Sequence, residues 1–399
     1  MKHGGLEAAR GLAALAVVLG HCAVAFAQSA PITVPPQILS LPFDGAAAVI
    51  FFFVLSGYVL TRRYVDLDDT SLLLVSAGKR YLRLVGPVMV ATLLSATLFA
   101  LGAYRYSEVG RAVGSDWLSD FGYAYDRRGN WSPSFADALL RGGVLVLFVP
   151  GNQNYDSPLG TICYEMLGSY LVFGLAFVCV KAQKTRGALS GLAWGAGLGL
   201  GAAWHPYYAA VVVGLGLSLL LSKERRPFRI DHAIALVALG AVLLSYQAAR
   251  NEYGWLAVLG LASASASYVQ ILGAAAIICG LEGCPQLALA FSGRKSRFLG
   301  ALSFPIYLVH FLVLGSLGCA LWLYAAPRWG LFVGGLIATL ATVITSLLVS
   351  VPFIYFDSAW VRLVNLIASK FMRRPTLKQS RVPVDHTRRA ASRQGKAAI

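Results

Sequence analysis

The sequence predicts an all-α polytopic membrane protein with about ten transmembrane helices. Three observations lead to this fold class. The 399 residues are 57% hydrophobic and only 13% charged, whereas a soluble domain carries roughly 25% charged residues. Several apolar runs, such as 329–356, approach or exceed the roughly 18 residues that suffice to cross a bilayer. Finally, Lys and Arg gather in alternate connections between these runs, as the positive-inside rule predicts for a chain that crosses repeatedly.

The expected spans are the apolar segments between polar connections. They cover residues 8–27, 43–61, 84–103, 158–180, 187–204, 207–222, 231–247, 256–281, 298–324 and 329–356. The first of them resembles a secretory signal peptide. We expect it to remain in the protein, because no clear cleavage site stands out and further spans follow.

The distribution of basic residues predicts that both termini are cytoplasmic. The connection 28–42 has no Lys or Arg, whereas 62–83 has five and 223–230 has four. This alternation holds only if the apolar stretch 138–150 does not cross, so we predict a partial or re-entrant segment there. The long connection 104–137 then lies outside the cytoplasm, where it is either an ordinary loop or part of a binding site.

Composition also divides the chain into two parts. Residues 1–358 form the predicted transmembrane domain, and 359–399 a basic, disordered cytoplasmic tail. The tail is expected to bind anionic lipids and not nucleic acid, because polybasic segments beside a membrane helix are attracted to the negatively charged leaflet. The six cysteines have no CxxC spacing, so we expect neither a disulfide framework nor a metal site.

Two ionisable residues of the first span share one helix face. Arg10 and His21 are eleven residues apart, and eleven steps of about 100° end about 20° past three turns, about 16 Å along the axis. Glu7 lies on the same side and can orient the Arg10 guanidinium. Arginine binds phosphate through a planar fork, and histidine can accept a hydroxyl proton near neutral pH. The pair therefore indicates a reaction that joins a cytoplasmic anion to a group deep in the membrane. The alternatives are a snorkelling arginine and a histidine that only joins two helices.

Five short motifs in order resemble those of acyltransferase family 3, the bacterial membrane O-acyltransferases that modify surface polysaccharides and other glycans. They are 6–15 (LEAARGLAAL) followed by His21, 51–58 (FFFVLSGY), 80–87 (RYLRLVGP), 160–165 (GTICYE) and 299–310 (LGALSFPIYLVH). Gly160 stands where the family often has tryptophan, and Phe304 where it often has tyrosine. The first departure removes aromatic packing beside Glu165, and the second is mild.

The resemblance implies an acyl-coenzyme A donor, most simply acetyl-CoA, and as acceptor a glycan or a lipid-linked sugar at the cell (inner) membrane. Catalytic roles are expected for His21, Arg10, Glu165 and His310. Donor-binding roles are expected for Arg10, Lys79, Arg80, Arg83 and Ser56.

Three of these roles remain open from the residues alone. Glu165 can hold the second ring nitrogen of His21, bind the acceptor or pair with an arginine. His310 can assist catalysis or make a structural hydrogen bond. Ser56 can contact a substrate or another helix.

Two mechanisms and one other class of function compete at this point. Direct transfer with His21 as general base is favoured over an acyl-enzyme formed on Ser56 or His21. A transporter or flippase for a lipid-linked sugar also suits ten spans with inward-facing charges. We find no obvious repeat between the two halves of the sequence of the kind that many transporters have.

The predicted topology can be tested with a reporter fused after Asn152. It should give the signal of the compartment outside the cytoplasm, because the segment 138–150 is expected to turn back. A cytoplasmic signal at this position would contradict the assignment of both termini.

Overall fold

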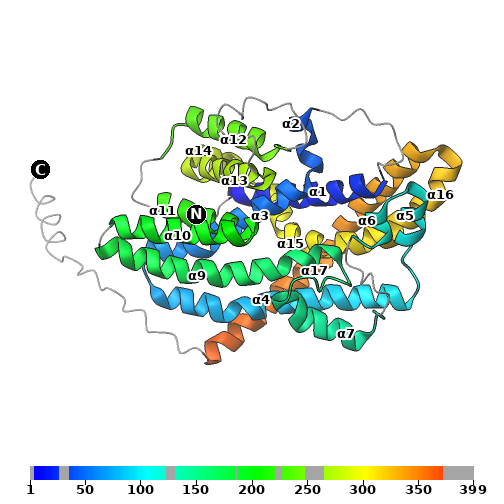
Figure 1. Ribbon diagram of the computed structural model, residues 1–399, viewed down its shortest axis with the longest axis horizontal. Helices are drawn as coiled ribbons and strands as arrows, with labels where there is room; N and C mark the ends of the chain where they lie inside the picture. The colour runs from blue at the N-terminus through cyan, green and yellow to red at the C-terminus, as the bar shows by residue number, and fades with distance from the viewer. Residues whose placement is uncertain are drawn as a thin grey trace, which may run out of the picture.

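We describe the fold from a computed structural model of the full chain. The described residues are 4–26, 36–122, 131–185, 187–221, 227–247 and 265–371. This part of the chain consists of helices and the turns between them, without a β-strand. Most of the long helices run close to the long axis of the molecule (Figure 1).

The long helices follow the order of the predicted spans. They are α1 (Gly4–Phe26), α3 (Gly45–Leu67), α4 (Thr70–Ala100), α9 (Ile162–Thr185), α10 (Gly187–Trp204), α11 (Pro206–Leu220), α12 (Ile230–Leu244), α13 (Ala266–Gly283), α15 (Arg294–Val313) with α16 (Cys319–Trp329), and α17 (Leu331–Phe371). The shorter elements are α2 (Gln37–Ser40), η2 (Leu41–Phe43), α5 (Tyr106–Val113), α6 (Asp116–Ser119), α7 (Phe135–Leu140), η3 (Arg141–Leu145), α8 (Val146–Phe148), η4 (Ser157–Thr161), α14 (Pro285–Ala290) and η6 (Leu314–Gly318).

Seven helices in the described part of the chain are long and apolar enough to cross a membrane. The all-helical fold class is therefore confirmed. The other three predicted spans form α10, α11 and α12, of which α11 and α12 are shorter apolar helices. The count of ten spans and the cytoplasmic position of both termini stay predictions. Residues 256–264 of the eighth predicted span lie outside the described residues.

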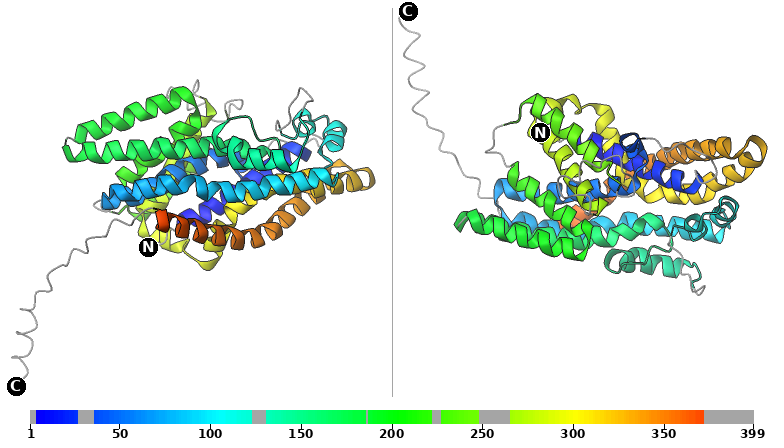
Figure 2. Two further views of the ribbon diagram at one scale, coloured as in Figure 1. Left: turned by 90° about the horizontal axis from the view of Figure 1, so that it is seen from below. Right: turned by 45° about the horizontal axis from the view of Figure 1, so that its top comes forward.

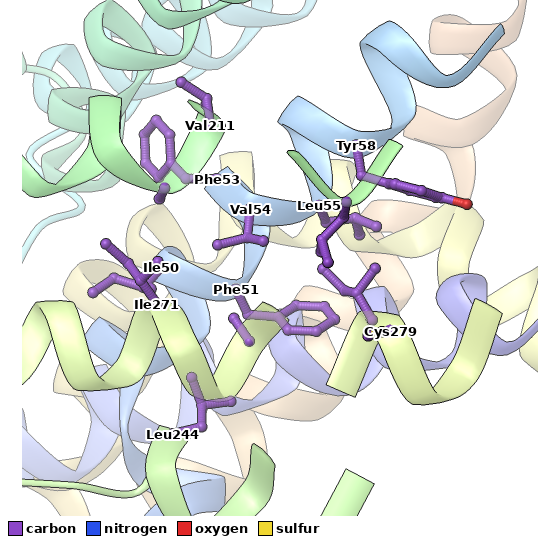
Figure 3. Packing of buried hydrophobic residues seen from close by; sticks show 14 of the residues in the cluster. Ile50, Phe51, Phe53, Val54, Leu55, Tyr58, Val211, Leu244, Ile271 and Cys279 are labelled. Carbon is purple, nitrogen blue, oxygen red and sulfur yellow. The ribbon is translucent and has the colours of Figure 1, made fainter. Parts of the chain in front are cut away.

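Helix α3 lies at the centre of the largest apolar cluster, between α1, α11 and α13. Figure 3 shows its side chains, with Phe53 and Val54 toward α11 and Phe51 toward α13. The backbones of α3 and α11 nearly touch at two glycines. A Cβ atom on Gly57 would lie 2.0 Å from the Val211 carbonyl oxygen, and one on Gly214 would lie 2.1 Å from that of Val54. Close packing of this kind drives helix association in lipid, where water supplies no hydrophobic force.

The segment 138–150, which is predicted to turn back, lies in a short helical region that forms one arm of a hairpin. Residues 135–148 are helical, a length of about 21 Å at 1.5 Å per residue, which is too short for a bilayer core of about 30 Å. The two ends of the segment meet, because the Ser134 amide donates to the Tyr155 hydroxyl at 2.9 Å and that hydroxyl donates back to the Ser134 carbonyl at 2.8 Å. The chain therefore leaves this region at the end where it entered.

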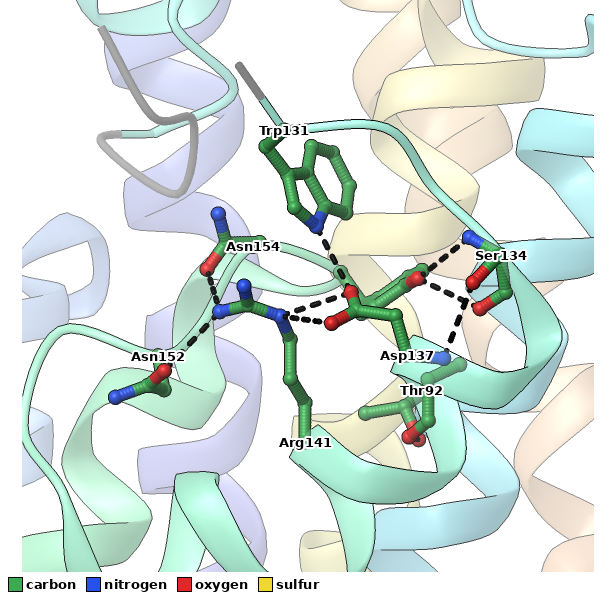
Figure 4. A network of polar contacts seen from close by, with 9 residues as sticks. Thr92, Trp131, Ser134, Asp137, Arg141, Asn152 and Asn154 are labelled. Carbon is green, nitrogen blue, oxygen red and sulfur yellow. Dashed lines mark hydrogen bonds and ion pairs between the residues drawn. The ribbon is translucent and has the colours of Figure 1, made fainter. Parts of the chain in front are cut away.

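Arg141 joins the helical arm of this hairpin to the segment that follows it (Figure 4). Its guanidinium donates to Asp137 at 2.9 Å, to Asn152 at 3.1 Å and to Asn154 at 2.7 Å. Burial alone would raise the pKa of the Asp137 carboxyl, but hydrogen bonds from Trp131 and Arg141 outweigh it and hold this pKa below its usual value. The charged form of Asp137 is thus the one that the network stabilises.

Helix α17 corrects the predicted boundary at residue 358. The helix continues to Phe371, so residues 359–371 are not a disordered tail. Polar contacts with α4 hold this end of the helix. Asp357 forms an ion pair with Arg83, the Trp360 indole donates to the Leu82 carbonyl at 2.6 Å, and Asn365 accepts from Lys79 at 2.9 Å. Figure 2 shows α4 and α17 side by side. The rest of the predicted tail, 372–399, lies outside the described residues.

The contact between α3 and α11 predicts that Gly57→Ala destabilises the protein. The new methyl group would overlap the Val211 carbonyl, and overpacking of this kind costs about 1–3 kcal/mol. The thermal midpoint of the purified protein in detergent should fall. The matched control is Gly199→Ala in α10, where a Cβ atom meets nothing within 4 Å. Equal midpoints for the two variants would contradict the close contact.

Candidate functional site

The predicted polar face of α1 is covered by α15. A Cβ atom on Gly11 would lie 2.2 Å from Leu299, and one on Gly300 would lie 2.1 Å from Glu7, so the two helices can approach closely only because both positions are glycine. Arg10 donates to the Ser303 hydroxyl at 3.2 Å and lies 3.6 Å from the Glu7 carboxylate. Glu7 therefore orients Arg10 as the sequence predicts.

His21 pairs with His310 farther along the same two helices. The Nδ1 atom of His21 is 2.9 Å from the Nε2 atom of His310. The Nδ1 atom of His310 lies 3.0 Å from the carbonyl oxygens of both Ile306 and Tyr307. A carbonyl only accepts hydrogen bonds, so His310 carries its proton on Nδ1, and its Nε2 is an acceptor when the ring is neutral.

This arrangement fixes the tautomer of His21. Because the Nε2 atom of His310 accepts, the Nδ1 atom of His21 must donate. The remaining ring nitrogen of His21, Nε2, is then an unprotonated acceptor, the form that a general base needs. The Trp117 and Phe311 rings surround the His21 ring, with centroids 5.6 Å and 5.5 Å away. His21 itself is half-buried.

A cavity of about 360 Å³ opens beside Arg10. This volume lies within the range of small-molecule sites, roughly 300–1,000 Å³. Its lining combines apolar side chains of α3, α4, α9 and α15 with polar groups of α1, α3, α4, η4, α9 and α15. The polar lining residues are Arg10, Ser56, Arg80, Arg83, Thr161, Glu165, Ser303 and Tyr307.

Each arginine of the cavity faces a carboxylate. Arg80 pairs with Glu165, which also accepts from the Ser56 hydroxyl at 2.8 Å. Arg83 makes two hydrogen bonds to Asp357, and Arg10 faces Glu7, as described above. Pairing of this kind offsets the cost of removing a guanidinium from water. Of the three alternatives for Glu165, the structure therefore has the pair with an arginine.

One face of α15 joins the cavity to the histidine pair. Ser303, Tyr307 and His310 lie at positions i, i+4 and i+7, about 10 Å along the helix from first to last. Ser303 and Tyr307 line the cavity, and the Tyr307 and His310 rings are 6.1 Å apart. The Tyr307 hydroxyl donates to the Pro158 carbonyl at 2.6 Å and lies 2.6 Å from the Thr161 hydroxyl. Tyr307 thus lies between the cavity and the histidine pair.

Most of the predicted site residues come together. Arg10, Ser56, Arg80, Arg83 and Glu165 line the cavity, and His21 and His310 lie beyond Tyr307. Lys79 does not join them, since it is not a lining residue and its amine donates to Asn365 of α17 at 2.9 Å.

Sequence reasoning missed Ser303, Tyr307 and Asp357. The first two were detectable, because they share one face with His310 inside the motif 299–310. The sequence around Asp357 does not indicate that this residue pairs with Arg83, because the two are 274 residues apart.

Comparison with known proteins identifies the family of the chain. Residues 3–351 match the family described as "Acyltransferase domain". The chain belongs to this acyltransferase family. The enzyme is also similar to the O-acetyltransferase PaAT-1 of Phomopsis amygdali, with 23% identity over 439 residues that span 95% of this chain and 86% of the relative. No solved structure matches the chain significantly.

The family assignment confirms the resemblance that the five motifs indicate. The protein is an acyltransferase, and its seven long apolar helices make it a membrane protein. The matched region includes every residue that lines the cavity and also His21 and His310, but not Asp357, the partner of Arg83.

Proposed function

We propose that this acyltransferase moves an acyl group, most simply acetyl, from cytoplasmic acyl-coenzyme A to a hydroxyl of a surface polysaccharide, lipopolysaccharide or other glycan. The observation that carries the proposal is the line of polar groups along α15. It leads from a cavity with three arginines to a histidine whose free nitrogen is unprotonated. The O-acetyltransferase relative supports oxygen as the atom that receives the acyl group.

The donor would bind with its phosphates among Arg10, Arg80 and Arg83. Each of these guanidiniums already has a carboxylate partner, so a phosphate must share or replace that partner. Coenzyme A carries several phosphate charges, which compete with single carboxylates better than a monoanion can. The pantetheine arm would then extend past Ser303 toward Tyr307.

Transfer would be direct. The Nε2 atom of His21 removes the proton of the acceptor hydroxyl as its oxygen attacks the thioester carbonyl carbon. The new C–O bond forms, the C–S bond breaks, and the proton passes from His21 to the departing coenzyme A sulfur, so that no net proton is consumed. His310 acts as a positioning residue, because it holds the Nδ1 proton of His21 and with it the tautomer.

An acyl-enzyme on Ser56 is less favoured by the contacts. The Ser56 hydroxyl donates to Glu165, whose charge is already shared with Arg80. A base that is held in an ion pair is a weak acceptor for a nucleophile's proton. A flippase function is also less favoured, since the chain belongs to an enzyme family. The proposed location is the cell (inner) membrane, with the basic C-terminal residues on anionic lipid.

The donor site can be tested through the KM for acetyl-CoA. Arg83→Gln removes a charge-assisted hydrogen bond, which is worth about 1.5–3 kcal/mol, so the KM for acetyl-CoA should rise about tenfold or more. Arg10→Ala should nearly abolish transfer. Thiol release by purified protein, in the presence of surface glycan from cells that lack this gene, measures both.

Lys79→Gln is the matched control for the donor site. It also removes a cation from α4, but one outside the cavity, and it should leave the KM for acetyl-CoA within about twofold of wild type, a change below 0.5 kcal/mol. An equal effect of Lys79→Gln and Arg83→Gln would mean that only the general surface charge matters.

The role of His21 predicts a loss of kcat. His21→Gln keeps hydrogen bonding but cannot take a proton, and transfer should fall by roughly 10²–10⁴-fold. His310→Phe should lower kcat by less and change the pH profile of kcat, because the tautomer of His21 is no longer fixed. Near-normal transfer by His21→Gln would make another residue the base. An unchanged pH profile in His310→Phe would leave His310 with a packing role alone.

A further inference from the structure

Asp156 is a buried acid that the proposed reaction does not use. It precedes η4, in the turn that joins the hairpin arm to α9. The residue has no exposed surface. Neither of its carboxyl oxygens has a hydrogen-bond partner among the described residues. Its backbone is fully engaged, since the Asp156 amide donates to Gln153 and its carbonyl accepts from Leu159, both at 3.0 Å.

A carboxyl group without partners is costly in a protein interior. Buried polar side chains almost always find a hydrogen bond, and exceptions require an explanation. Burial raises the pKa of Asp156 well above its usual value, because no cation among the described residues offsets the loss of water. In its neutral form, which burial favours, the group offers one hydroxyl donor and free acceptor positions.

The turn that carries Asp156 packs against the catalytic part of α15. Two residues after Asp156, the Pro158 carbonyl accepts from Tyr307. Ser157, which directly follows Asp156, donates to the Gly122 carbonyl at 2.6 Å. Gly122 in turn lies against the Phe311 ring, which stacks edge-on against His21. The turn that carries Asp156 therefore contacts Tyr307 directly and borders the Phe311 ring through Gly122.

The hairpin holds this turn in place. Arg141 binds Asn152 and Asn154, as Figure 4 shows, and the Tyr155 hydroxyl donates to the Ser134 carbonyl. The Tyr155 carbonyl also accepts from Ser95 of α4. Asp156 is therefore presented by a turn that is fixed before any ligand arrives. Rigid support of this kind is what a binding residue requires.

We propose that Asp156 binds hydroxyl groups of the acceptor and so places the reacting hydroxyl beside His21. This inference rests on the proposed function, because it concerns the second substrate of the same reaction. A sugar offers adjacent hydroxyls that both donate and accept, which matches the hydrogen-bonding capacity of a carboxyl group. Among the polar groups named for the site, Asp156 is the buried one with capacity left over.

The test separates acceptor binding from donor binding. The probes are acetyl-CoA and the surface glycan isolated from cells that lack this gene. Asp156→Leu should raise the KM for the glycan about tenfold, the effect of one lost hydrogen bond, Asp156→Asn should raise it less because the amide keeps a donor and an acceptor, and both should leave the KM for acetyl-CoA unchanged. Asp116→Asn is the matched control, since Asp116 is an exposed acid on α6 beside Trp117. It should change neither constant. An unchanged KM for the glycan in both Asp156 variants would overturn the inference.

A second measurement needs no transfer. If Asp156 is unpaired in the empty protein, Asp156→Leu removes an unsatisfied polar group, and the thermal midpoint without substrates should stay the same or rise. A clear fall would show that the carboxyl has a structural partner and would overturn the inference on its own. Absence of transfer in the wild-type protein itself would instead overturn the proposed function, and the acceptor role with it.

Discussion

The close contact between α1 and α15 is the constraint on which the site depends. Glycines at Gly11 and Gly300 let the two helices approach until a methyl group would not fit between them. The helices run in the same direction, because residue numbers rise together from the Arg10–Ser303 contact to the His21–His310 contact. The packing of α1 against α15 therefore fixes both polar contacts and the distance between them. In a soluble protein such a pair of polar contacts would compete with water, but in lipid the two helices are each other's partners.

A second constraint is the neutralisation of the cavity. Three guanidiniums at the edge of a membrane domain would repel one another and lose hydration, and each has an acid beside it for that reason. The acids come from three different helices, α1, α9 and α17. The cavity is therefore nearly neutral when empty and becomes a strong anion site only for a ligand that displaces several carboxylates together. Under the proposed function, this arrangement would favour a donor with several phosphates over small anions and would link occupancy of the cavity to the positions of α9 and α17.

The sequence predicted the fold and the first-helix site better than the contacts between distant helices. Apolar run length located every long helix, and helical periodicity placed Arg10 and His21 on one face, because both properties are local. The pairs His21–His310 and Arg83–Asp357 join residues 289 and 274 positions apart, and no single segment encodes them. The predicted boundary at residue 358 differs from the end of α17 at Phe371 for the same reason. The polar residues after Phe356 read as the end of a helix, but Asp357 and Trp360 bond to α4 and extend it. Lys79 was grouped with Arg80 by adjacency, although neighbouring residues point about 100° apart on a helix.

The position of Tyr307 shows what the reaction needs beyond these contacts. The reacting oxygen and the thioester carbon must approach to about 3–3.5 Å, yet the arginines and His21 lie on opposite sides of this ring. Its hydroxyl is held by Pro158 and Thr161, which are the residues that follow Asp156 into α9. A ligand that engages Asp156 therefore acts on the same turn that holds Tyr307 in place. Under the proposed function, acceptor binding at Asp156 would therefore act on the element that fixes the ring between the two substrates.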